Sequence, residues 1–174
     1  MATGADLLVD AFDRVREVVR GAVDGATPGQ LAEQLDDQAN SIAWLIWHLT
    51  RVQDDHVADV AGVEQIWTAQ GWDQRFNLPF HPKETGYGQS GDHVAAVRVE
   101  SPELLTGYYD AVHQMTVGYV RGLTDADYDR IVDESWDPPV TLGVRLVSVV
   151  SDTLQHAGQA AFVRGIVDRA HRAK

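Results

Sequence analysis

The stretch from Thr141 to Arg169 constrains the fold most, because it has the apolar periodicity of one long helix while an acid and a histidine occupy core positions of that pattern. At about 100° per residue, Asp152 and His156 fall within one apolar stripe and, four residues apart, point the same way. The other members of the stripe are Leu142, Arg145, Leu146, Val149, Thr153, Ala160 and Val163. An unpaired carboxylate is rarely buried, so we expect a cation to meet Asp152. The two candidates are Arg145 and a metal ion held together with His156.

Three earlier stretches show the same periodicity and predict three more long helices, at residues 5–22, 41–62 and 101–122. Asn40 or Ser41 is expected to cap the second of these helices, and Gly62 is expected to end it. Four long helices with one long crossover loop predict an all-α fold, a four-helix bundle. The chain length is typical of one domain, so residues 1–174 are expected to form a single helical domain.

The longest connection, residues 63–100, loses the helical periodicity and is rich in Gly, Pro and aromatic residues. A short helix is expected near residues 64–70, and residues 92–98 could form a helical turn or a strand, of which the helical turn is favoured. A connection of this length is usually functional or disordered, and the aromatic side chains favour an ordered loop that packs over the helices. Residues 128–140 predict an irregular crossing with Trp136 near its tip.

Charge and composition exclude several classes of partner. The chain has 26 acidic and 14 basic residues, a formal net charge of −12, and no cluster of Lys and Arg, so nucleic acid and anionic membrane are poor partners. The N-terminus lacks the features of a signal peptide, and no apolar run approaches the ~18 residues of a membrane span. A cytoplasmic protein is therefore expected. Because the chain has no Cys, His and carboxylate are its metal-binding groups, and any reactive thiol must come from another molecule.

One set of residues has the composition of a metal site. Asp152 and His156 can bind one ion from a single helix, and His48 on the second long helix could complete three ligands. Three N/O ligands with an open fourth position are typical of a catalytic zinc or similar divalent ion. The spacing leaves open a structural pair of Asp152 with Arg145 or with His156, and an ordinary core histidine at position 48.

Two further polar residues belong to this hypothesis. Gln159, one turn after His156, is a candidate to orient a ligand or a bound water, and its alternative is a polar residue at the edge of the core. His113, near the inner stripe of the third long helix, is a weaker candidate for the same site.

The second and fourth long helices resemble those of the DinB/YfiT-like family. The resemblance rests on SIAWLIWHLTRVQDDHVADVAG and SDTLQHAGQAAFVRG and covers nearly the whole chain. It implies an up-down-down-up four-helix bundle with a divalent metal. The family's ligand on the second helix falls on His48, and its final ligand falls on His156, which is followed by Ala-Gly-Gln. Many members have His at the position of Asp152, and the mycothiol-dependent maleylpyruvate isomerase has Glu there; the shorter Asp alters the reach of this ligand.

The family includes low-molecular-weight-thiol S-transferases, so the resemblance implies transfer or isomerisation with a thiol such as mycothiol or bacillithiol. The metal would hold this thiol as thiolate near neutral pH. Zinc is the first expectation, and nickel, iron and manganese also suit two His and one Asp. Trp44, Trp136 and the loop at residues 72–89 would shape a pocket for a small-molecule substrate. The aromatic content and the resemblance are compatible with a homodimer.

Two other functions compete with the thiol S-transferase. One is a metal-dependent hydrolase that uses metal-bound water. The other is a non-enzymatic, stress-linked binding or scaffold bundle in which Asp152 and His156 are only structural. Dependence of turnover on a thiol separates the two enzymes, and metal content separates both from the scaffold.

Overall fold

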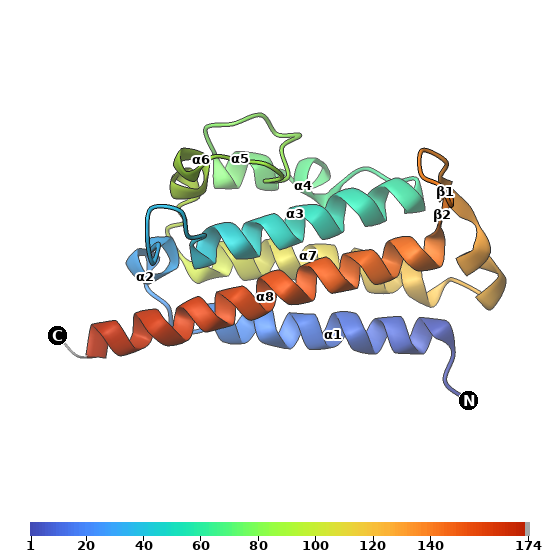
Figure 1. Ribbon diagram of the computed structural model, residues 1–174, viewed down its shortest axis with the longest axis horizontal. Coiled ribbons are helices and arrows are strands. Elements are labelled where there is room, and N and C mark those ends of the chain that lie inside the picture. The colour runs from blue at the N-terminus through green and yellow to red at the C-terminus, as the bar shows by residue number, and fades with distance from the viewer. Residues whose placement is uncertain (173–174) are drawn as a thin grey trace.

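The computed structural model describes residues 1–172 and is mostly helical, which confirms the all-α class. Its long helices lie side by side along the long axis of the molecule (Figure 1); they are α1 (Gly4–Val23), α3 (Ile42–Ala61), α7 (Pro102–Arg121) and α8 (Leu142–Arg172). α1 and α8 run in one direction and α3 and α7 in the other (Figure 1). α8 packs against α3 and α1, and α7 packs against the same two helices. α3 and α8, which carry the three expected ligands His48, Asp152 and His156, therefore pack against each other.

Local capping explains where the long helices begin and end. The side chain of Thr3 accepts a hydrogen bond from the backbone N–H of Asp6 in a capping box at the start of α1. Ser41, one of the two predicted caps, accepts from the N–H of Trp44 at the start of α3. Gly62 ends α3 in the left-handed conformation, which glycine adopts without a steric penalty.

Short elements fill the connections between the long helices. They are α2 (Pro28–Ala32), α4 (Ile66–Ala69), α5 (Trp72–Phe76), α6 (Gly91–Ala96), the 3-10 helix η1 (Asp125–Asp129), β1 (Ile131–Asp133) and β2 (Val140–Thr141). α4 and α6 confirm the two short helices predicted in the long connection, and α5 adds a third. The crossing expected to be irregular, residues 128–140, instead contains most of an antiparallel pair of short strands, and η1 overlaps only its first two residues.

The buried stripe of α8 contains the residues that directly follow Asp152 and His156, and not these two residues themselves. Its buried residues are Leu142, Leu146, Val149, Thr153, Ala157, Ala160, Val163 and Val167. Asp152 and His156 each precede a buried residue by one position, so they lie at the edge of the stripe and not inside it. Their side chains are 39% and 20% exposed. The sequence pattern was right about the helix and its inner face but placed these two polar residues too deep, because adjacent helical positions differ by about 100° in direction.

None of the helices described over residues 1–172 has a stretch that is both long and apolar enough to cross a membrane.

Candidate metal centre

His48 on α3 meets Asp152 and His156 on α8 where the two helices pack together. One potential ligand atom from each residue lies within 4.8 Å of the others. The imidazole rings of His48 and His156 are 4.8 Å apart between centroids, at an interplanar angle of 73°. The packing of α3 on α8 thus brings together the three residues that the sequence proposed as ligands, which we call the triad (His48, Asp152 and His156).

The other ring nitrogen of each histidine already has a hydrogen-bond partner. Nδ1 of His48 lies 2.5 Å from the carbonyl oxygen of Thr85, and because a carbonyl can only accept, Nδ1 must donate. Nδ1 of His156 lies 3.0 Å from Oε1 of Gln159 and donates to it. In a neutral imidazole the remaining nitrogen, Nε2, then carries a free lone pair. Histidines that bind metals are usually held by a second hydrogen bond of this kind.

The alternative partners of Asp152 are not available to it. Arg145 is engaged elsewhere: its Nη2 lies 3.0 Å from Oδ2 of Asp133, and its Nη1 donates to Nδ1 of His56 at 2.8 Å. His156 Nε2 is 3.6 Å from Asp152 Oδ1, which is too far for a hydrogen bond. Oδ2 of Asp152 is buried and has no hydrogen-bond partner among residues 1–172. A buried carboxylate oxygen without a partner, beside two imidazole nitrogens, fits a divalent cation.

Burial keeps His48 in the form that a metal requires. Desolvation is the main cause that lowers the pKa of His48, and the nearby His156 lowers it further; the hydrogen bond to Thr85 and the charge of Asp152 oppose this shift. His48 is therefore neutral near pH 7, where a protonated imidazole could not act as a ligand.

Trp44 forms a wall of the site. Its ring stacks on His48 at 4.5 Å and meets His156 edge-on at 6.4 Å, and its indole N–H donates to Oε1 of Gln89 at 2.9 Å. Trp44 thus lies next to the triad. Trp136 lies between β1 and β2 and is 65% exposed, so its place in a substrate pocket stays a prediction.

The weaker histidine candidate lies elsewhere in the molecule. His113 is on α7, and its Nε2 is 2.9 Å from Oδ1 of Asp13 on α1. Its interaction partner is therefore on α1, whereas the triad is formed by α3 and α8.

The sequence did not identify the backbone that covers His48. Gly86 has φ = +99°, and a Cβ added there would lie 2.6 Å from Nδ1 of His48 and 3.1 Å from ring atoms of Trp44 and of Trp47. Only glycine permits such a close approach in this conformation. The two glycines that flank Tyr87 were the available sequence signal for a special turn in the long connection.

The buried histidines predict how the stability of the metal-free protein depends on pH. Burial is the main cause that lowers the pKa of His48, His56 and His113 below the unfolded value of about 6.5. Below that value the unfolded chain binds more protons than the folded chain, so the free energy of unfolding should fall as the pH drops through about 6.5. Above it, these residues should have no effect. Urea unfolding of chelator-treated protein at several pH values measures this dependence, and equal stability on both sides of pH 6.5 would contradict it.

Removal of the partner of His156 should weaken metal binding. We expect Gln159→Leu to lower zinc affinity about 10- to 100-fold, the usual effect of losing a group that orients a ligand. The matched control is Gln155→Leu, because within residues 1–172 the side chain of Gln155 hydrogen-bonds to Ser151 alone, one turn earlier on the same helix. A competition titration with a chromogenic chelator measures both variants, and equal affinities would remove Gln159 from the site.

Together, the fold and the site define a class: an all-helical protein with two histidines and one aspartate gathered between two long helices. The chain belongs to the mycothiol S-transferase family, whose model matches residues 7–169, and this confirms the DinB/YfiT-like resemblance. The structure is similar to the crystal structure of a conserved protein from Enterococcus faecalis, with a TM-score of 0.90 and 26% sequence identity. That match covers 96% of this chain and 98% of the other. No functionally curated protein matches the sequence.

Proposed function

We propose that the protein is a metal-dependent enzyme of the low-molecular-weight-thiol S-transferase type, built on an up-down-down-up four-helix bundle. His48, Asp152 and His156 would hold the divalent ion. The observation that carries the proposal is the buried, unpartnered Oδ2 of Asp152 beside two histidines whose Nδ1 atoms are already bonded. The family membership supports the thiol chemistry.

Two nitrogens and one oxygen leave at least one coordination position open, which is typical of catalytic sites. Zinc is the first candidate, and nickel, iron and manganese accept the same donors. When bound, the ion would act as a Lewis acid that favours the thiolate form of a mycothiol- or bacillithiol-like cosubstrate near neutral pH. Because the chain contains no Cys, the reacting sulfur must belong to the cosubstrate.

The protein's own residues hold and shield the site. Thr85 and Gln159 fix the orientation of the two imidazoles through their Nδ1 hydrogen bonds. The stacked ring of Trp44 excludes water from one face of His48. We propose that Trp44, Trp136 and the loop at residues 72–89 line the pocket for a small-molecule electrophile.

Metal analysis followed by a turnover assay tests the function. Protein purified without a His tag should contain, or take up on supplementation, about one divalent ion per chain if the triad is a single site. A chromogenic electrophile should then be consumed only when mycothiol or bacillithiol is added. Turnover without thiol would favour the metal-dependent hydrolase. Absence of both metal and turnover would favour the non-enzymatic binding bundle.

We also propose a homodimer that uses the outer face of α8. Exposed apolar side chains share one side of this helix at about 100° per residue; they are Val144, Val147, Leu154 and Phe162. Size-exclusion chromatography with light scattering measures the mass, and a monomer at micromolar concentration would contradict the dimer. The cytoplasmic location stays a prediction.

A further inference from the structure

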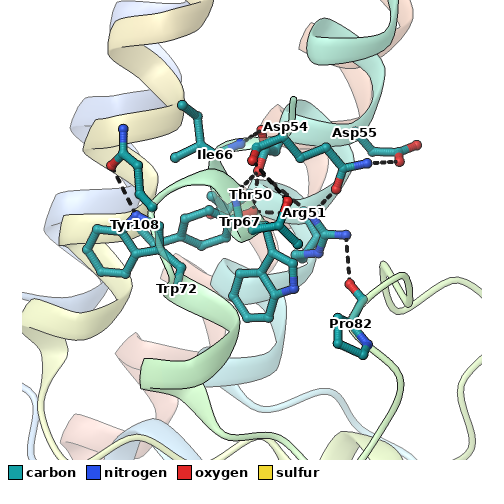
Figure 2. A network of polar contacts seen from close by, with 12 residues as sticks. Thr50, Arg51, Asp54, Asp55, Ile66, Trp67, Trp72, Pro82 and Tyr108 are labelled. Atoms are coloured by element: carbon teal, nitrogen blue, oxygen red, sulfur yellow. Dashed lines mark hydrogen bonds and ion pairs between the residues drawn. The ribbon is translucent and has the colours of Figure 1, made fainter. Parts of the chain in front are cut away.

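A fully buried arginine lies one turn beyond His48 on α3. The side chains of Arg51 and Asp54 are both 0% exposed. The Nη1 atom of Arg51 donates to Oε1 of Gln65 at 2.8 Å and to the hydroxyl of Tyr108 at 3.3 Å. Figure 2 shows this network, with Arg51 between Tyr108 and Pro82. Burial of a charged group is expensive, so its partners indicate what it holds in place.

The hydrogen bonds of Arg51 do not go to Asp54. Their closest N–O distance is 3.7 Å, whereas Asp54 accepts hydrogen bonds of 2.9 and 2.8 Å from the first two backbone N–H groups of α4 and one of 2.8 Å from Tyr108. Asp54 is thus already satisfied, and it supplies charge compensation to Arg51 without using the hydrogen-bonding capacity of the guanidinium. The strongest Arg–carboxylate pairs have direct hydrogen bonds, and the contact between Arg51 and Asp54 has none.

The remaining donors of Arg51 reach the segment at residues 82–89, which we call the strap. Nη2 donates to the carbonyl of Pro82 at 3.4 Å, and Nε donates to the carbonyl of Glu84 at 3.3 Å. The next carbonyl along the strap, that of Thr85, accepts the hydrogen bond from Nδ1 of His48. Two consecutive carbonyls are therefore held by two side chains one turn apart on α3.

Three side chains on one face of α3 hydrogen-bond to the strap along its length. Trp44, His48 and Arg51 follow one another at intervals of four and three residues, so they project from the same face of the helix. Trp44 donates to the side chain of Gln89 at the far end of the strap, and Gln89 in turn donates to Glu84 at 2.8 Å. Arg51 holds the end at which the chain enters the strap.

We infer that Arg51 is a positioning residue for His48 and acts through the strap. By fixing the carbonyls of Pro82 and Glu84, Arg51 sets the place of the Thr85 carbonyl. That carbonyl selects the His48 tautomer with hydrogen on Nδ1, which leaves Nε2 free to act as a ligand. The link to metal affinity rests on the proposed function, while the link to the tautomer does not.

The test uses Arg51→Lys in the 174-residue chain. Lysine keeps the charge beside Asp54 but cannot make the separate Nε, Nη1 and Nη2 hydrogen bonds. In the metal-free protein, we expect faster solvent exchange of the Nδ1 proton of His48, observed by NMR. In the zinc-supplemented protein, we expect about tenfold weaker zinc binding. The matched control is Gln53→Met, because Gln53 is also buried on α3 but donates to Thr116 on α7.

A second variant tests the same inference if Arg51→Lys fails to fold. Arg51→Met with Asp54→Asn removes both charges together and so leaves no uncompensated buried charge. Rapid Nδ1 exchange and weaker zinc binding in the folded Arg51 variants, but not in Gln53→Met, support the inference. Wild-type exchange in the Arg51 variants, or equal acceleration in Gln53→Met, overturns it. If the wild-type protein takes up no zinc, the proposed metal site fails, and the Nδ1 measurement still decides the role of Arg51.

Discussion

His156→Ala is expected to weaken zinc binding by more than about 100-fold, because loss of a ligand must cost more than loss of a group that only orients one. The variant would leave one imidazole and one carboxylate facing the ion. Stability should change little, since the side chain of His156 is 20% exposed at the edge of the core. A chelator competition titration gives the affinity, and thermal unfolding gives the stability.

The matched control for this variant is His113→Ala. The side chain of His113 is the more deeply buried of the two, at 8% exposed, and its Nε2 interacts with Asp13. It should therefore affect stability at least as much as His156→Ala while leaving zinc affinity unchanged. Equal loss of affinity in both variants would mean that the ion, if one binds, is not held by the triad.

The helices were predictable from sequence because their signals are local. The apolar periodicity of α3 and α8, the cap at Ser41 and the stop at Gly62 all depend on residues within a few positions of one another. The strand pair β1–β2 was missed because two and three residues give too short a pattern to recognise, and their pairing depends on contacts across a turn.

The Asp152–His156 pair was predictable for the same reason, whereas His48, on a different helix, was assigned through the family resemblance. One of the alternatives for this pair depends on packing. The spacing of Asp152 and His156 places them on one side of α8, but the choice between Arg145 and a metal depends on what else Arg145 contacts. Asp133, which forms an ion pair with Arg145, lies in the crossing that was predicted to be irregular. Whether Asp152 pairs with Arg145 therefore depended on Asp133, whose position no helical periodicity predicted.

The strap could not be predicted because its contribution to the site is made by backbone atoms. The carbonyls of Pro82, Glu84 and Thr85 have no residue-type signature, and their positions follow from the path of the long connection. Arg51 did carry a signal, since a charged residue one turn after His48 on a largely buried helix requires partners.

Gly86→Ala is the second substitution with a large expected effect, and it tests the strap directly. The new Cβ would lie 2.6 Å from Nδ1 of His48, closer than atoms can approach. The next two nearest atoms, at 3.1 Å, belong to the rings of Trp44 and Trp47, which are packed in the core. The strap must therefore move away from α3, which breaks the hydrogen bond between Thr85 and His48. We expect zinc affinity to fall about 10- to 100-fold. The left-handed backbone adds a loss of stability of about 1–3 kcal/mol.

Gly88→Ala separates these two effects. Gly88 also has a positive φ, +69°, but nothing lies within 4 Å of a Cβ placed there. Both variants should therefore lose stability through backbone strain, which urea unfolding measures, and only Gly86→Ala should lose zinc affinity and the slow exchange of the His48 Nδ1 proton. If Gly88→Ala weakened zinc binding as much, general loosening of the loop would explain the loss. If neither variant did, the contact between the strap and His48 would have no part in holding the metal ligand.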